Sequence, residues 1–179
     1  IRAGAGVNNI DLEKASSSGV YVANCPGKNS DAVAELALGH IIACDRRIVD
    51  ASLDLRSGNW KKKAYQNAAG LKGRTLGIIG LGSIGRALAK LAKGLNMRVI
   101  AWSRSLTPDK ADKLDLVYCE SIDEVAANAD VISVHLAVTP DTKHLLNTKF
   151  FNKMKDEAIF VNTSRGEIVD TAALRKAID

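Results

Sequence analysis

The chain has 179 residues, of which 46% are hydrophobic and 25% are charged, and its formal net charge is +5. This length and hydrophobic content suffice for one substantial core, so one main domain is expected. No apolar run of the sequence reaches membrane-spanning length, and its first residues resemble neither a signal peptide nor a transit sequence. The composition therefore argues against a membrane protein and predicts a cytoplasmic one.

The cysteines and the basic residues argue against a cysteine-bound metal site and against a nucleic-acid-binding protein. Cys25, Cys44 and Cys119 are widely spaced and form no Cys-x-x-Cys pair, which predicts reduced thiols and no metal site. The densest basic cluster, residues 61–63 beside Trp60, is interpreted as a solvated loop, because basic and acidic residues alternate elsewhere and no nucleic-acid-binding motif is present. No nucleic-acid partner is expected, and the positive excess suits an anionic cofactor or substrate.

The first third of the chain predicts a short strand and a long helix. Residues 19–24 are strand-like and end at a Pro-Gly pair, and Ser30 is a suitable N-cap for the helix that follows. Apolar residues then recur every three or four positions to Leu55, which predicts one helix of about seven turns. Residues 36–44 are apolar almost all round, which predicts burial on more than one side, either within the chain or against another subunit; a homodimer is expected. His40, in this part, is interpreted as a packed core residue.

A glycine motif follows a short apolar run. Residues 75–79 predict a strand that passes directly into a Gly-x-Gly-x-x-Gly turn at Gly80, Gly82 and Gly85. A helical pattern continues to Gly94, and a second strand follows at once, so the segment has the length of one βαβ unit. Taken alone, the motif also fits an ordinary strand-to-helix turn, but this context favours a dinucleotide-binding site.

The residues of this turn suit a pyrophosphate. Gly80 and Gly82 permit a tight turn and close approach of the backbone to the ligand, and Gly85 lets the helix pack on the strand. The first turn of the helix, with Ser83 and Ile84, presents unpaired N–H groups and the positive end of the helix dipole. All five residues are therefore candidate cofactor-binding residues.

Strands and helices alternate through the rest of the sequence. This alternation predicts an α/β fold with a Rossmann-type doubly wound parallel sheet, whose ligands lie at the carboxyl ends of the strands. The expected strands are residues 98–102, 116–118, 130–136 and 158–162, and the expected helices are residues 122–128, 148–154 and 170–179.

The end of the second strand bears on the choice of cofactor. An acidic residue there, about twenty residues past the glycines, usually holds the ribose hydroxyls of NAD. Here Ser103 takes that place and Arg104 follows. The carboxylate that repels a 2′-phosphate is absent and a guanidinium that binds one is present, which favours NADP, or use of both cofactors, over strict use of NAD. The alternative is that Arg104 points to solvent and the ribose is held in another way.

Four segments together resemble one family. They are residues 1–11, the pair Ala34 and Glu35, the pair Val134 and His135, and residues 162–170, in which Asn-Thr-Ser-Arg-Gly is the most specific. Over essentially its whole length the chain resembles the D-isomer-specific 2-hydroxyacid dehydrogenases. The resemblance implies that residues 1–25 are the remnant of a substrate domain and that residues 26–179 form a dinucleotide-binding domain without its final segment.

The resemblance also assigns substrate-binding roles. Arg165 matches the catalytic arginine, whose planar fork holds the carboxylate of a 2-oxo acid while its charge polarises the carbonyl that receives hydride. The backbone N–H groups at Ala5 and Gly6 match a carboxylate cradle. Arg2 is a candidate for a substrate phosphate; if it pairs locally instead, a simpler hydroxy acid fits as well.

Further cofactor contacts are implied at two strand ends. Thr163 and Ser164 precede the catalytic arginine, and Leu136 and Ala137 follow the fourth strand of the nucleotide domain. Many members have a proline where Ala137 stands, so contacts at this pair are expected to be made mainly by the backbone.

The resemblance implies an NAD(P)-dependent oxidoreductase acting on a small 2-hydroxy or 2-oxo acid. The opening Arg-Ala-Gly-x-Gly-Val is most similar to the D-3-phosphoglycerate dehydrogenase branch. The alternatives are the branch of NADPH-dependent glyoxylate and hydroxypyruvate reductases, and a non-enzymatic NAD-sensing module similar to transcriptional corepressors.

One part of the family's machinery is not matched. The general-acid histidine and its supporting glutamate are expected beyond the end of this sequence, and His40, His135 and His144 do not match them. We therefore expect an internal fragment that turns over no substrate by itself.

Overall fold

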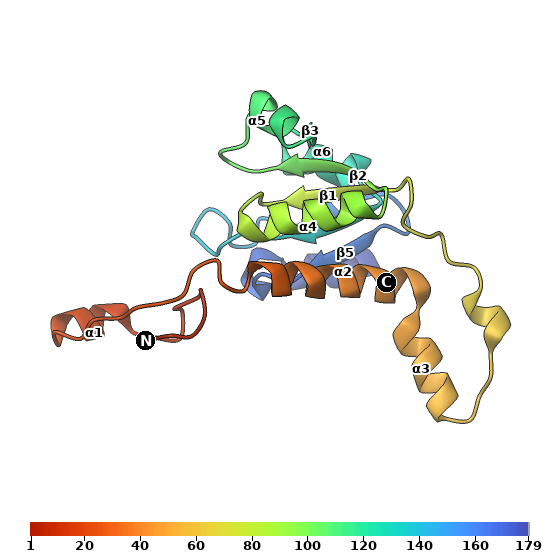
Figure 1. The fold of residues 1–179 in the computed structure, drawn as a ribbon, viewed down its shortest axis with the longest axis horizontal. Helices are drawn as coiled ribbons and strands as arrows, with labels where there is room; N and C mark the ends of the chain where they lie inside the picture. Colours follow the sequence, from red (N-terminus) through yellow and green to blue (C-terminus); the bar gives the residue numbers. More distant parts are fainter. Residues whose placement is uncertain (179) are drawn as a thin grey trace.

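A five-stranded parallel sheet forms the centre of the computed structural model, which describes residues 1–178. The strands lie in the order β3-β2-β1-β4-β5, so the chain order reverses between β1 and β4 (Figure 1). Their bounds are β1 (Thr75–Ile79), β2 (Arg98–Trp102), β3 (Val117–Tyr118), β4 (Val131–Val134) and β5 (Ile159–Asn162). This is the doubly wound order of a Rossmann fold, and the predicted fold class is confirmed.

Helices cover both faces of the sheet. One face carries α2 (Ser30–Arg46) and α4 (Ser83–Gly94), and the other carries α6 (Ile122–Asn128), α7 (Thr148–Phe151) and α8 (Thr171–Ile178). The remaining elements are α1 (Leu12–Ser17), α3 (Ile48–Arg56), α5 (Pro108–Lys113) and the 3-10 turns η1 (Lys62–Tyr65) and η2 (Gly166–Ile168). None of the helices within residues 1–178 is both long and apolar enough to cross a bilayer.

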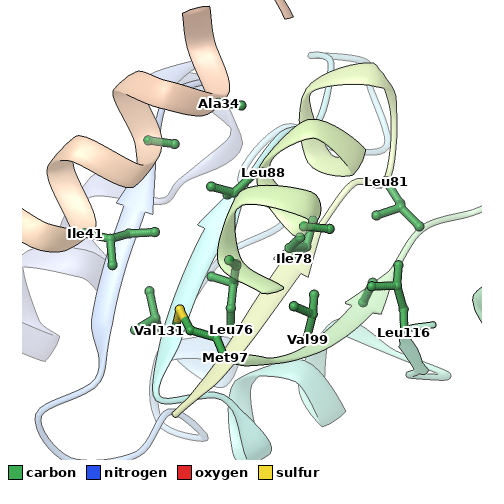
Figure 2. Packing of buried hydrophobic residues seen from close by; sticks show 14 of the residues in the cluster. Ala34, Ile41, Leu76, Ile78, Leu81, Leu88, Met97, Val99, Leu116 and Val131 are labelled. Atoms are coloured by element: carbon green, nitrogen blue, oxygen red, sulfur yellow. The ribbon is translucent and has the colours of Figure 1, made fainter. Parts of the chain in front are cut away.

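The side chains of β1 supply the core on both faces, because successive residues of a strand point to opposite sides. Leu76 and Ile78 join Leu88 of α4 and Ile41 of α2 in one buried cluster (Figure 2). Ile79 belongs to the second cluster, with residues of α6, α7 and α8. A central strand buried in this way fixes the position of its carboxyl end, where the glycine turn begins.

The single long helix predicted from residue 30 to residue 56 is wrong, because two helices meet at Arg47. Arg47 is left-handed (φ 50°, ψ 42°), and α3 turns away from α2 and from the body of the protein (Figure 1). Arg47 Nε donates to Asp50 Oδ2 (3.1 Å), and its guanidinium lies 5.0 Å from the centre of the Tyr65 ring. These contacts stabilise a one-residue break that leaves the hydrophobic period on either side unchanged.

Two finer predictions for α2 are also wrong. The N-cap residue is Asn29 rather than Ser30, and it makes no side-chain capping hydrogen bond. His40 is not packed in the core as predicted. The helix is buried along one stripe within the chain, and Leu36 and His40 are exposed on its other side. The buried stripe is Ala34, Ala37 and Ile41. The apolar stretch therefore has no second cover among the described residues.

The first 25 residues extend from the body beyond the start of α2 (Figure 1). The strand predicted at residues 19–24 is wrong: the segment joins no sheet among the described residues. Its backbone meets that of the chain start at two points, where the Arg2 N–H donates to Ala23 O (2.7 Å) and the Cys25 N–H donates to Gly4 O (3.0 Å). Two isolated bonds place the opening loop but form no ladder.

We predict that Gly77→Ala destabilises the fold. A Cβ at Gly77 would lie 2.5 Å from Val125 Cγ1 and 2.8 Å from Ala129 Cβ, so α6 would have to move away from β1. Overpacking of this kind costs about 1–3 kcal/mol, measured as the free energy of unfolding in urea. The matched control is Gly94→Ala, where the added Cβ meets open space at the end of α4 and gains up to ~1 kcal/mol of helix propensity. Equal stability of the two variants would contradict the packing.

Candidate active site

At the glycine turn the end of β1 meets the segment after β4 and the start of α4 at places where no side chain fits. Gly80 has φ +100°, and a Cβ there would lie 2.7 Å from the carbonyl oxygen of His135. A Cβ at Gly85 would collide with the carbonyl oxygen of Gly80. Gly82 differs, because nothing within residues 1–178 lies within 4 Å of the place that a Cβ would take, and a ligand has room there. The first and third glycines therefore serve packing, and the second leaves the turn open.

The first turn of α4 presents unused hydrogen-bond donors. Gly82 is the N-cap and makes no side-chain capping bond, and the first intrahelical bond runs from the Arg86 N–H to Gly82 O (3.0 Å). Within residues 1–178 the N–H groups of Ser83, Ile84 and Gly85 donate to no protein acceptor. A 12-residue helix whose first turn is uncapped and open suits the pyrophosphate of a dinucleotide.

The end of β2 lies next to this turn. The Gly80 N–H donates to Trp102 O (2.9 Å), which places Ser103 and Arg104 directly beyond the edge of the glycine turn. Ser103 is half-buried and its carbonyl accepts from the Leu106 N–H (3.0 Å). Arg104 is exposed and forms no ion pair with any residue of the described chain. Its guanidinium is thus available to a phosphate on the adenosine side of a cofactor.

A cleft of about 1270 Å³ runs along the carboxyl ends of β4 and β5. It joins the opening loop of the chain to the nucleotide side, and its wall includes most of the predicted substrate and nicotinamide-side residues. These are Arg2, Ala5, Gly6, Ile84, Leu136, Ala137, Thr163, Ser164 and Arg165, together with His135. The other cofactor candidates, Gly80, Gly82, Ser83, Gly85, Ser103 and Arg104, lie outside its wall, toward β1 and β2.

A hydrogen-bonded loop after β5 holds Arg165. Asn162 Oδ1 accepts from the Ser164 N–H (2.9 Å) and from the Ser164 hydroxyl (2.6 Å), and Asn162 Nδ2 donates to Arg165 O (2.9 Å). Arg165 Nη1 donates to Ser164 O (2.9 Å). The loop thereby fixes the backbone on both sides of Arg165 and directs one edge of its guanidinium.

The guanidinium of Arg165 reaches the opening loop of the chain. A Cβ at Gly6 would collide with Arg165 Nη2, so the two groups approach more closely than any other residue type at position 6 would allow. Among the described residues the N–H groups of Ala5 and Gly6 donate to no acceptor. A guanidinium beside two free N–H groups is an arrangement that binds a carboxylate.

Arg2 is tied to the same loop. Its Nε donates to Gly6 O (2.8 Å), and Asn24 Nδ2 donates to Ala5 O (2.7 Å) on the other side. Arg2 therefore pairs locally through one nitrogen while still lining the cleft. The local pairing leaves room for both substrates, a phosphorylated acid and a simpler hydroxy acid.

Leu136 and Ala137 form the wall of the cleft after β4. Leu136 Cδ2 lies 3.0 Å from where a Cβ of Gly80 would be, so it closes the gap beside the glycine turn. The carbonyl of Ala137 accepts from the Thr142 hydroxyl (2.7 Å), which holds this segment in place. The carbonyl oxygen of Ala137, one of the backbone groups expected to face a cofactor, therefore already accepts a hydrogen bond within the chain.

His135 has no role predicted from the sequence, yet it lines the cleft. Its Nε2 lies 2.9 Å from Ser133 Oγ, and its Nδ1 is buried without a partner within residues 1–178. The same holds for the hydroxyl of Thr163, the residue that follows the neighbouring strand β5. Burial lowers the pKa of His135 to about 4. The Ser-x-His spacing at a strand end places both side chains on one face and is the signal available in the sequence. Residues 1–178 contain no cluster of His, Cys, Asp or Glu arranged to hold a metal ion.

We predict a pH dependence of stability that belongs to His135. Its pKa falls from the ordinary 6.5 to about 4 on folding, so between these values the unfolded chain binds the extra proton and acid favours unfolding. The full stability is present above pH 6.5 and is lost as the pH falls toward 4. From about pH 7.5 to about pH 4.5 the free energy of unfolding in urea should fall by roughly 2 kcal/mol more in the wild type than in His135→Asn.

The control for this measurement is His144→Asn, since His144 is exposed. That variant should keep the pH dependence of the wild type. An identical loss in His135→Asn would show that His135 is not the group responsible.

Comparisons with known proteins agree with this geometry. Residues 38–179 match the family described as D-isomer specific 2-hydroxyacid dehydrogenase, NAD binding domain. A glyoxylate reductase of Thermococcus litoralis is 44% identical over 179 residues, with 97% of this chain and 54% of that protein covered. A D-3-phosphoglycerate dehydrogenase of Methanocaldococcus jannaschii is 38% identical over 177 residues, with 99% of this chain and 34% of that protein covered.

Solved structures of dehydrogenases have a similar fold. The structure of apo D-lactate dehydrogenase from Escherichia coli superposes with a TM-score of 0.89 at 36% identity, covering 97% of this chain and 54% of that one. The chain spans about half the length, or less, of the relatives that it matches. Because the family match extends over most of the sequence, the chain belongs to the D-isomer-specific 2-hydroxyacid dehydrogenases and carries their NAD-binding domain.

Proposed function

We propose that the protein carrying this chain transfers hydride between a nicotinamide cofactor and a short D-2-hydroxy or 2-oxo acid. The observation that supports this most directly is the approach of the Arg165 guanidinium to Gly6, beside the free N–H groups of the opening loop. This carboxylate site lines the same cleft as Ile84, on the uncapped first turn of α4. A substrate carboxylate and a dinucleotide would thus meet across one cleft.

Each part of the site has a distinct task in this reaction. The N–H groups of Ser83, Ile84 and Gly85 hold the pyrophosphate, and Arg165 holds the substrate carboxylate and polarises the adjacent carbonyl. When bound, the nicotinamide supplies hydride to the carbonyl carbon or takes it back from the alcohol. The carbonyl oxygen must also gain a proton as the carbon gains hydride.

The proton donor is proposed to lie outside the described residues. His135 is the histidine that lines the cleft, and its lowered pKa keeps it neutral, while His40 and His144 are exposed elsewhere. We therefore expect residues 1–179 alone to bind the cofactor without turnover. In the same proposal residues 1–25 belong to a substrate domain and residues 26–179 to the nucleotide domain.

Two substrate classes fit the site. A phosphorylated acid, as for a D-3-phosphoglycerate dehydrogenase, would use the remaining nitrogens of Arg2 at the wall of the cleft. The bond from Arg2 Nε to Gly6 O gives Arg2 a structural task without a phosphate, so the second class, glyoxylate and hydroxypyruvate, fits as well. A comparison of phosphohydroxypyruvate, hydroxypyruvate and glyoxylate separates the two.

We predict that Arg165→Lys disables the reaction without affecting the cofactor. Lysine keeps the charge but loses the planar fork, so kcat/KM of the whole protein with its best 2-oxo acid should fall by roughly 100- to 1000-fold. The Kd of the reduced cofactor, measured by its fluorescence, should stay unchanged. Arg175→Lys on the exposed side of α8 is the control. A wild type that binds cofactor but turns over none of the three acids would contradict an enzymatic function and favour a sensing module.

The cofactor is proposed to be NADP, or either NAD or NADP. Arg104 has no ion-pair partner in the described part of the chain, and Ser103 leaves no carboxylate to repel a 2′-phosphate. We predict that Arg104→Ala weakens NADPH binding by roughly tenfold and leaves NADH binding unchanged. Titration calorimetry with both cofactors measures this, with Arg175→Ala as the control. Equal losses for both cofactors, or none for either, would argue for the alternative in which Arg104 faces solvent.

The protein is proposed to form a homodimer through α2 and α3. Apolar side chains that are each more than half exposed occur along both helices and on the connection after α3, and α3 projects away from the body (Figure 1). They are Leu36, Val49, Leu53, Leu55 and Trp60. Patches of this kind mark protein interfaces in soluble proteins.

We predict that a charge in this patch separates the subunits. Sedimentation equilibrium should give twice the chain mass for the wild type and the monomer mass for Leu53→Glu, because an unpaired carboxylate would be buried in the interface. Lys90→Glu on the exposed side of α4 is the matched control and should remain dimeric. A monomeric wild type would contradict the proposal.

A further inference from the structure

Two residues with buried, unpartnered polar atoms follow paired positions at the carboxyl ends of β4 and β5. Val134 and Asn162 are register partners in the two parallel strands, so His135 and Thr163 are the next residues along each. His135 Nδ1 and Thr163 Oγ1 are both inaccessible to solvent and make no hydrogen bond within residues 1–178. Buried polar atoms are nearly always hydrogen-bonded, so this pair indicates a missing ligand group. Both residues line the cleft.

The neighbour of His135 fixes which ring nitrogen carries the proton. Ser133 is completely buried, and within the described chain its hydroxyl contacts one partner, His135 Nε2, at 2.9 Å. If Nε2 carried the proton, the Ser133 hydroxyl would accept it and its own hydrogen would be left buried without an acceptor. The favoured arrangement is therefore a Ser133 hydroxyl that donates to Nε2, with the proton of the imidazole on Nδ1. The unpartnered nitrogen is then a donor and requires an oxygen from the ligand.

The ring acts as a neutral hydrogen-bond donor. Burial lowers the pKa of His135 to about 4, so the imidazole carries no charge at neutral pH and cannot serve as the acid of the reaction. A neutral donor suits an uncharged oxygen, such as a hydroxyl, better than a phosphate, for which the free N–H groups of α4 are available.

The position of His135 selects the part of the cofactor. Its carbonyl group contacts Gly80 at the start of the glycine turn, and Thr163 on the next strand leads to Arg165 at the substrate end. Between the pyrophosphate and the nicotinamide, a dinucleotide has one sugar, the ribose of the nicotinamide half. The hydroxyls of that ribose are the uncharged oxygens nearest to the pyrophosphate on this side.

We propose that His135 Nδ1–H donates a hydrogen bond to a hydroxyl of the nicotinamide-side ribose and that the Thr163 hydroxyl binds the same sugar, with Ser133 as the positioning residue that sets the tautomer. This inference rests on the proposed function, since it requires that the cleft bind a nicotinamide dinucleotide. It adds a polar contact that orients the nicotinamide half over the substrate site.

Three ligands of increasing length test the contact. ADP contains the adenosine and the pyrophosphate, ADP-ribose adds the second sugar, and NADH adds the nicotinamide. Their Kd values are measured by calorimetry for the wild type, His135→Phe, Thr163→Val and the control His144→Phe. His135→Phe and Thr163→Val should each weaken NADH and ADP-ribose by roughly tenfold and leave ADP unchanged.

Other outcomes overturn the inference in different ways. A loss that includes ADP would mean that His135 is merely structural, and a loss for NADH alone would place the contact at the carboxamide. No loss for any ligand would mean that the cofactor reaches neither atom. If the wild type binds neither ADP nor NADH, the proposed function fails before this inference is tested. Thr163→Val, which removes one hydroxyl from a site of the same shape, keeps the test valid if His135→Phe does not fold.

A spectroscopic readout tests the tautomer without any variant of His135. The ¹⁵N shifts of the His135 ring in the wild type should report a protonated Nδ1 and an unprotonated Nε2, and ADP-ribose should move the Nδ1 signal while ADP should not. A protonated Nε2 in the free protein would contradict the assignment. In Ser133→Ala the preference for one tautomer should be lost.

Discussion

The close approach of α4 to the end of β1 is the constraint on which the rest of the site depends. It is possible because Gly85 has no side chain: a Cβ there would strike the carbonyl oxygen of Gly80. Gly80 in turn lets the end of β1 lie against the segment after β4, since a Cβ there would strike the carbonyl oxygen of His135. The approach carries the uncapped first turn of α4 to the carboxyl edge of the sheet, next to the end of β4. The free N–H groups at that edge are the site that we propose for the pyrophosphate.

The strand order then distributes the remaining tasks along the same edge. β2 lies on one side of β1 and carries Arg104, at the proposed adenosine end. β4 and β5 lie on the other side and carry His135 and Arg165, at the proposed nicotinamide end. The opening loop completes the carboxylate site by placing Gly6 against Arg165. The charged groups lie at the two ends of this edge, with the guanidinium of Arg104 at one end and that of Arg165 at the other. The neutral imidazole of His135 lies between them.

The sequence predicts the parts of this site that depend on local chemistry. The glycine motif, the β-strands of the sheet and the segment around Arg165 are each encoded within a few neighbouring residues, so local patterns suffice to find them. The left-handed break at Arg47 cannot be found in this way, because it leaves the hydrophobic period intact and is stabilised by Tyr65, eighteen positions later. The role of His135 is hidden as well, because its burial and its unpartnered nitrogen depend on which strands lie beside β4.

The most direct test of the account is an amide ¹H–¹⁵N titration of this chain with NADPH and NADH. We predict that the first additions of cofactor cause the largest chemical-shift changes at the N–H groups of Ser83, Ile84 and Gly85, because the pyrophosphate binds the first turn of α4. Further changes should appear at Thr163 and Arg165. Binding without shifts in that turn, or shifts confined to α2 and α3, would contradict the central claim that the glycine turn holds the cofactor.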